Sequence, residues 1–213
     1  MICDKRSCLG SSLSMIKLIP SHVQSNIYDQ YPSPLKYMIH ITRIGKIQGH
    51  LDDETAAKVI HAFITSRLDI SNALLAAISS ANICRLQITQ NTAVRLLTWT
   101  KQCEHITPVR ERLHWLPIDK RIVFKVLVQV YKALNDDCYP VYLRDLIQEY
   151  KPHRSLRSEN SNQLCVPRSH NAYGDRAFAK FAPAEWNALP KELKTVGSLS
   201  SFKKSLKTYL FHL

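Results

Sequence analysis

Residues 117–135 read PIDKRIVFKVLVQVYKALN, and this stretch determines the fold class more than any other part of the chain. Its apolar residues return every three or four positions, which is the spacing of one buried face of an α-helix. Pro117 suits the beginning of such a helix, because proline lacks the amide hydrogen that the first turn leaves without a partner. The residues predicted to be buried are Ile118, Ile122, Val123, Leu127, Val130, Tyr131 and Leu134.

Helical spacing recurs upstream over residues 34–47 and 80–99, and it is clearest after Asp52. An aspartate at this position can accept hydrogen bonds from the free amides of a first helical turn. Acidic residues at 53 and 54 suit the positive end of the helix dipole. We therefore expect a helix from residue 53. Its buried stripe is predicted to consist of Ala56, Val59, Ile60, Phe63 and Ile64.

Downstream, helices are expected after Pro140 and over Asp175–Trp186, and Ser198 is expected to cap a final helix. One pair of short segments, Gln163–Val166 and Asn171–Tyr173, is predicted to form a β-hairpin around a proline-containing turn. With only 5 glycines, the chain does not resemble a turn-rich β protein. The predicted fold class is mainly α, an irregular helical domain with one small β-hairpin.

The sequence predicts three regions. Residues 1–37 form an irregular N-terminal segment with weak periodicity. Residues 38–150 form a helical region, and residues 151–213 hold a basic loop, the small hairpin and the C-terminal helices, packed on the same domain. No apolar run approaches the roughly 18 residues that a membrane-spanning helix needs, so no membrane partner is expected.

The charge balance favours a polyanionic partner. The chain has 29 Lys and Arg against 17 Asp and Glu, a net charge of +12. The excess lies mainly in residues 84–135, with nine basic and three acidic residues, and in residues 151–213, with eleven basic and four acidic ones. Basic surfaces attract nucleic acid because binding to phosphates releases condensed counterions. A basic surface without a partner remains the alternative.

Catalytic and metal-binding patterns are missing from the sequence. The aspartate pairs Asp52-Asp53 and Asp136-Asp137 lack the preceding aromatic residue of a polymerase palm, and both are predicted to lie at helix boundaries as caps. There is no Cys-x-x-Cys zinc pattern, nucleophile elbow or glycine-rich phosphate loop. We therefore predict no enzymatic activity, metal, cofactor or small-molecule substrate. The six scattered cysteines are expected to be reduced thiols in a nuclear or cytoplasmic, intracellular protein.

The most promising binding surface is the basic loop that begins at Lys151. Cations close to aromatic and polar side chains are the mixture that phosphate clamps and stacking platforms use. The alternative is that the arginines bond to local carbonyls or pair with Asp175 and Glu159. The predicted nucleic-acid-binding residues are Lys151, Arg154, Arg157, Arg168 and Arg176, with Lys203, Lys204 and Lys207 as additional electrostatic help.

A series of motifs gives the chain a family resemblance between about residues 38 and 211. The motifs, in chain order, are Ser66-Arg-Leu-Asp69 with Asn72-Ala-Leu-Leu75, Gln90-Asn-Thr-Ala93, His105-Ile-Thr-Pro108, Leu113-His-Trp-Leu-Pro117, Tyr131-Lys-Ala-Leu-Asn135, Arg154-Ser-Leu-Arg-Ser158, Val166-Pro-Arg168, Tyr173-Gly-Asp-Arg-Ala-Phe178, Trp186-Asn-Ala-Leu-Pro190 and Ser201-Phe-Lys-Lys-Ser-Leu-Lys207. This order resembles the C-terminal, post-catalytic region of LINE-type (non-LTR) retrotransposon reverse transcriptases of the broad Jockey group.

The resemblance implies a role in holding nucleic acid rather than in catalysis. In such polyproteins the endonuclease and the palm aspartates precede this region, so no catalytic residue of the family maps onto this chain. The implied function is phosphate-directed binding of RNA or DNA during target-primed reverse transcription, with the polymerase domain as a further partner. Ile70 and Ser71 stand where the family usually has Tyr and Cys. A non-functional transposon remnant and a protein-interaction domain without nucleic-acid binding therefore remain alternatives.

Overall fold

The computed structural model describes residues 34–69, 75–76, 79–136, 138–150 and 162–213, and these are mainly helical, as the sequence predicts. They gather into two compact units. The first contains the described part of residues 1–69 together with residues 84–113, and the second contains the described parts of residues 70–83 and 114–213. The long helix predicted from residues 117–135 belongs to the second unit together with the C-terminal elements.

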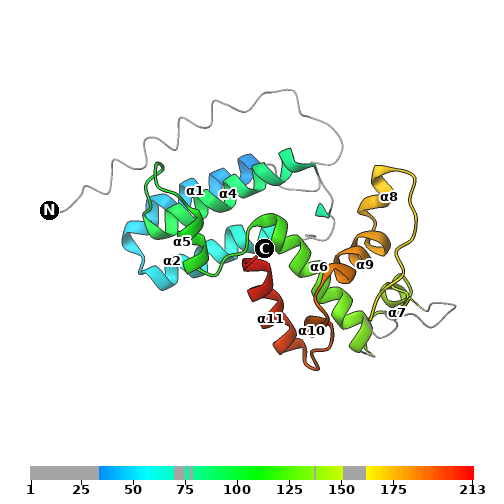
Figure 1. The fold of residues 1–213 in the computed structure, drawn as a ribbon. Coiled ribbons are helices and arrows are strands. Elements are labelled where there is room, and N and C mark those ends of the chain that lie inside the picture. The colour runs from blue at the N-terminus through cyan, green and yellow to red at the C-terminus, as the bar shows by residue number, and fades with distance from the viewer. Residues whose placement is uncertain (1–33, 70–74, 77–78, 137, 151–161) are drawn as a thin grey trace. The chain divides into compact units, whose positions relative to one another are not determined.

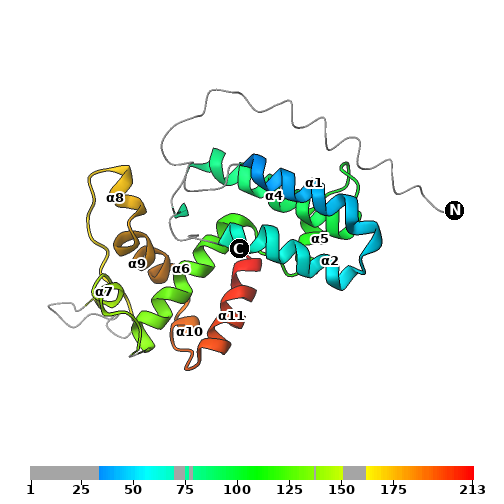
Figure 2. The ribbon, with the colours of Figure 1, turned by 180° about the vertical axis from the view of Figure 1, so that it is seen from behind.

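The first unit is a set of helices around an aliphatic core (Figures 1 and 2). Gln48, buried at the end of the first helix, donates a hydrogen bond from its side chain to the carbonyl of Leu96 in α4, which ties these two elements together. Ile41, Ile44, Val94 and other small aliphatic residues fill the core. The elements are α1 (Pro34–Ile47), η2 (Gln48–His50), α2 (Asp53–Ile60), η3 (His61–Thr65), α3 (Ser66–Asp69), α4 (Ser80–Thr98, from Cys84 onward in this unit) and α5 (Thr107–Arg112).

The helix after Asp52 begins as predicted but departs from regular geometry in the middle. The Asp52 carboxylate accepts a hydrogen bond of 3.0 Å from the Thr55 amide and caps α2. Residues 61–65 form a π-helical turn, η3, between α2 and α3. A π turn accommodates an additional residue, and the buried apolar positions accordingly recur every four residues, with Thr65 buried beside them. They are Ala56, Ile60, Ile64 and Leu68.

Because of this turn, the prediction that Phe63 lies in the core is wrong. Phe63 was expected in the buried stripe because a regular helix of 3.6 residues per turn places positions 56, 60, 63 and 64 on one face. The extra residue rotates Phe63 away from the core, and 46% of its surface is exposed. Ile64, which was also predicted to be buried, is fully buried.

The second unit is organised around α6, which contacts α9 and α11 (Figure 1). The chain turns into α6 at His114, whose ring edge contacts Phe211 near the C-terminus. Asp136 closes α6, and its carboxylate accepts a hydrogen bond of 3.0 Å from the Cys138 amide. The elements are α6 (Ile118–Asn135), α7 (Val141–Arg144), α8 (Ala172–Arg176), α9 (Phe178–Ala188), α10 (Lys191–Lys194) and α11 (Leu199–Phe211).

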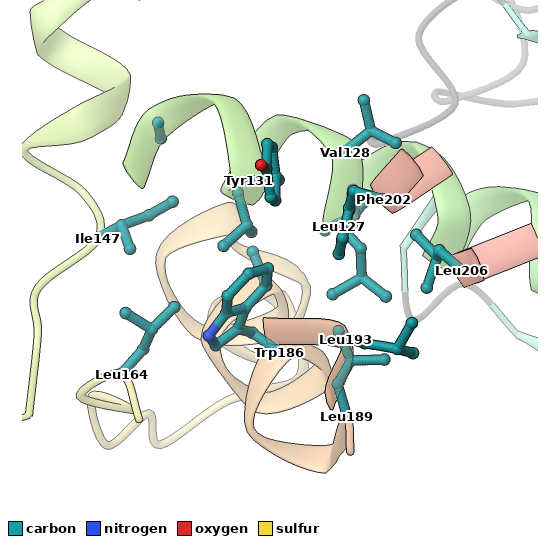
Figure 3. Close-up of a cluster of buried hydrophobic side chains, with 14 of the residues drawn as sticks. Leu127, Val128, Tyr131, Ile147, Leu164, Trp186, Leu189, Leu193, Phe202 and Leu206 are labelled. Atoms are coloured by element: carbon teal, nitrogen blue, oxygen red, sulfur yellow. The ribbon is translucent and has the colours of Figure 1, made fainter. Parts of the chain in front are cut away.

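Aromatic side chains join the three main helices of this unit (Figure 3). Phe202 of α11 is completely buried and stacks on Tyr131 of α6, with ring centroids 4.4 Å apart and planes 19° apart. Trp186 of α9 lies 6.0 Å from the Phe202 ring. The Tyr131 hydroxyl donates a hydrogen bond of 2.7 Å to the Val196 carbonyl before α11. The one polar atom of this stacked pair thus has a partner, as burial requires.

The predicted hairpin between Gln163–Val166 and Asn171–Tyr173 is wrong. Residues 163–165 pair instead with residues 148–150, through an antiparallel bridge between Glu149 and Leu164. Two backbone hydrogen bonds flank it, from the Tyr150 amide to Gln163 (2.9 Å) and from the Cys165 amide to Gln148 (2.8 Å).

The second half of the expected hairpin is helical because Asn171 caps α8. Its side chain accepts a hydrogen bond of 2.6 Å from the Gly174 amide. Gly174 is required here, because a Cβ atom would lie 2.8 Å from the Cβ atom of Ser169. Among the described residues, no helix is long and apolar enough to cross a bilayer.

Candidate nucleic-acid interface

The three predicted lysines of α11 share one side of a helix whose other side is buried. Ser198 caps α11, as predicted, by accepting a hydrogen bond of 3.2 Å from the Ser201 amide. Phe202, Leu206 and Leu210 anchor the helix in the core. Lys203 and Lys204 are exposed and Lys207 is half-buried. Their spacing places the three cations within about 100° around the helix axis.

The α11 lysines form no ion pair within the described part of the chain, although Glu192 of α10 lines the same surface pocket as Lys204. Residues 199–211 contain no Asp or Glu. Among the described residues, no carboxylate lies within ion-pair distance of Lys203, Lys204 or Lys207. We call these three side chains the α11 lysine face. Ammonium groups that reach solvent and form no ion pair can contact phosphates without reading the base sequence.

Arg168 and Arg176 belong to another part of the second unit, where the hydroxyl of Ser169 donates a hydrogen bond to the Asp175 carboxylate. Arg168 is exposed in the segment that leads from Leu164 to α8, and Arg176 is half-buried at the end of α8. Asp175, one of the carboxylates considered as a partner for these arginines, is bound instead by Lys180 at 2.5 Å and by the hydroxyl of Ser169. These hydrogen bonds hold the pKa of Asp175 below its usual value.

The structure does not bring all predicted cations together. In both views α8 and α11 lie on opposite sides of α6 (Figures 1 and 2), so Arg176 at the end of α8 is separate from the α11 lysine face. Lys151, Arg154 and Arg157 lie outside the described residues.

The two ends of the basic loop are nevertheless held firmly in the described structure. The backbone bonds between residues 148–150 and 163–165 close the loop at its base. On the other side, the Asn187 side chain accepts a hydrogen bond from the Leu164 amide and donates one to the Leu164 carbonyl, both 2.8 Å. The Trp186 indole donates a hydrogen bond of 3.0 Å to the Asn162 carbonyl. The Trp-Asn pair of α9 therefore fixes where the chain leaves the loop.

Sequence reasoning missed a second group of cations, in the first unit. Arg43 of α1 and Arg67 of α3 are the charged groups whose field acts on the His40 ring. His40 in turn stacks on Phe63. The spacings His40–Arg43 and Phe63–Arg67, three and four residues within helices, are the signals that could have revealed that each pair shares a helix face.

The described residues show no cluster of metal ligands. Among the described residues, no three His, Cys, Asp or Glu side chains are placed to hold a metal ion. The first aspartate of each pair acts as a cap. Hydrogen bonds from Thr55 keep the pKa of exposed Asp52 below its usual value, which is the behaviour of a helix cap. No protein-family model, curated protein or solved structure matches this chain.

Proposed function

We propose that this chain binds RNA or DNA through phosphates, as the non-catalytic, post-catalytic region of a LINE-type reverse transcriptase of the Jockey group. Its role would be to hold template or target strands during target-primed reverse transcription. The observation that carries the proposal is the α11 lysine face, three cations without a carboxylate partner among the described residues. The described residues of the second unit add to this field, with thirteen Lys and Arg against seven Asp and Glu.

The structural role of one motif behind the family resemblance also supports the proposal. A region that holds nucleic acid needs its basic loop presented from a fixed base, because each side chain that is already positioned costs less entropy on binding. Trp186 and Asn187 provide such a base at residues 162–164. The first two residues of the Trp186-Asn-Ala-Leu-Pro190 motif thus hold residues 162–164, which directly follow the loop that contains Arg154 and Arg157.

A charge-neutralising variant of the α11 lysine face tests the proposal. The variant combines Lys203→Gln, Lys204→Gln and Lys207→Gln. Binding of a single-stranded RNA is measured across a range of salt concentrations. If each lysine contacts one phosphate, the slope of log affinity against log salt should fall by about 0.7 per lysine, or about 2 in total.

The matched control removes the same amount of charge elsewhere. It combines Lys58→Gln, Lys101→Gln and Arg112→Gln, three exposed residues of the first unit. Lys58 already pairs with Glu54 at 2.7 Å. The control should keep nearly the whole slope. Equal losses in both variants would show that net charge alone is responsible and would reject the α11 lysine face.

A second candidate function, protein interaction, is favoured by α7. Val141 and Tyr142 are 65% and 70% exposed, and exposed Leu146 follows them. Contiguous apolar surface of this kind is typical of a docking site. A polymerase palm domain of the same retrotransposon group is the partner that the resemblance implies. Capture of such a domain by the chain, and its loss on Val141→Ser with Tyr142→Ser, would support this function.

A further inference from the structure

The rings of His40 and Phe63 form a stacked pair on the surface of the first unit. Their centroids are 5.9 Å apart and their planes differ by 24°. His40 comes from α1 and Phe63 from the π-helical turn η3, so the pair joins two elements. Nearly half of the Phe63 surface is open to solvent. A flat aromatic surface with an open side can accept another ring.

The groups around this pair are cationic. The Arg67 Nη1 atom lies 2.9 Å from Nε2 of His40. Because a guanidinium only donates hydrogen bonds, Nε2 must accept, and the imidazole is uncharged with its proton on Nδ1. Burial, followed by the charges of Arg67 and Arg43, keeps the pKa of His40 below its usual value. Residues 34–47 contain no Asp or Glu, and α3, which carries Arg67, ends in Asp69.

The π turn is the reason that Phe63 faces outward. A regular helix would bury this side chain, and the chain instead leaves the Phe63 ring half exposed against His40, whose ring lies in the field of two arginines. Irregular turns of this kind cost stability and are frequent at functional sites. The π turn and the aromatic ring that it exposes therefore form one local feature of the first unit.

We propose that His40 and Phe63, flanked by Arg43 and Arg67, form a stacking site for an unpaired nucleobase of a single-stranded nucleic acid. The aromatic pair offers the flat face, and the two guanidinium groups attract the phosphates on either side of the base. A duplex would not fit this chemistry, since its bases are already stacked. This site rests on the proposed function, but it lies in the first unit and contacts a base, whereas the α11 lysine face contacts phosphates.

Substitutions of Phe63 in the full-length chain test the site. Binding is compared for oligo(rA) and for an oligonucleotide of equal length made of abasic sites, which keeps the phosphates and removes the bases. Phe63→Ala should weaken oligo(rA) binding about fivefold or more, the usual effect of removing one base–aromatic stack. It should leave binding of the abasic strand unchanged.

Three further variants separate stacking from other causes. Phe63→Tyr keeps a flat ring and should retain binding, while Phe63→Leu keeps an apolar side chain without a ring and should abolish the preference for oligo(rA). Ile39→Ala removes an apolar side chain of α1 that is 50% exposed and should have no effect. Circular dichroism of each variant should match that of the parent chain, because Phe63 contributes little to the core.

Each remaining result overturns the inference in a recognisable way. Full binding by Phe63→Leu would indicate a general apolar contact, such as a protein-docking surface, and would reject base stacking. Equal losses for the two oligonucleotides would show that the substitution acts through charge or folding. If the parent chain binds neither strand, the proposed function and this inference fall together. If it binds both strands and Phe63→Ala does not differ, only this inference fails.

Discussion

Phe202→Ala should be among the most damaging single substitutions in the second unit. The Phe202 ring is completely buried, stacks on Tyr131 at 4.4 Å and lies 6.0 Å from the Trp186 ring. Truncation of a buried phenylalanine costs about 3–5 kcal/mol, from reduced burial and from the cavity left behind. A domain has only about 5–15 kcal/mol of stability, so a large part of it would disappear. Since Phe202 fixes α11 to α6, the α11 lysine face should lose its fixed position as well.

Urea unfolding, followed by tryptophan fluorescence to which buried Trp186 contributes together with Trp99 and Trp115, measures this effect. The midpoint should move to a lower urea concentration without a change of slope. Tyr142→Ala is the matched control, because this aromatic side chain is 70% exposed in the same unit. It should change stability by less than about 0.5 kcal/mol. A destabilisation below about 1 kcal/mol for Phe202→Ala would refute the packing of α11 on α6 described above.

Three further predictions concern the second unit. Asn187→Ala should destabilise it by about 2–4 kcal/mol in urea unfolding, because the amide and carbonyl of Leu164, which is 3% exposed, are both left without their partner; an unchanged midpoint would contradict the described bonds. Because the folded pKa of Asp175 lies below its ordinary value of 3.8, its contribution to stability is present above that pH and is lost as pH falls from there through the folded pKa. Lys180→Met should raise that pKa in an NMR titration, and no change would show that the ion pair does not form in solution. A third variant neutralises the predicted cations in and around the basic loop, which are Lys151, Arg154, Arg157, Arg168 and Arg176. The slope of log RNA affinity against log salt should fall by about 0.7 for each phosphate contact that is lost. An unchanged slope and affinity would reject these residues as a binding site.

The parts of the fold that local signals determine could be predicted from the sequence. The apolar period of residues 118–135 identified α6, and its predicted core residues Ile118, Ile122 and Leu127 are buried. Asp52 and Ser198 cap α2 and α11 as expected. A cap and its helix lie within four residues of one another, so the sequence contains all the information needed.

The two errors in the fold have different physical origins. The hairpin failed because the true partner of residues 163–165 is Gln148–Tyr150, on the far side of the basic loop, while Asn171 had a stronger local role as a cap. The prediction that Phe63 is buried was wrong because it assumed the regular period of 3.6 residues per turn. In the sequence, the π turn is indicated by apolar residues spaced four positions apart, from Ala56 to Leu68.

The candidate site was predictable only in part. Lys203, Lys204 and Lys207 could be placed on an exposed helix face from their spacing alone. Their separation from Arg176 depends on how α8 and α11 pack on α6, which no local pattern encodes. The base of the basic loop depends in the same way on long-range contacts, since Asn187 bonds to Leu164 across more than twenty residues.

The central claim is that this chain binds nucleic acid through phosphates, and a salt titration of RNA binding by the purified chain tests it most directly. Circular dichroism recorded first should show a helical protein. We expect a linear decrease of log affinity with log salt, with a slope that corresponds to several phosphates and that falls by about 2 in the α11 lysine variant. A folded, helical chain that binds neither RNA nor DNA at low salt would contradict the account.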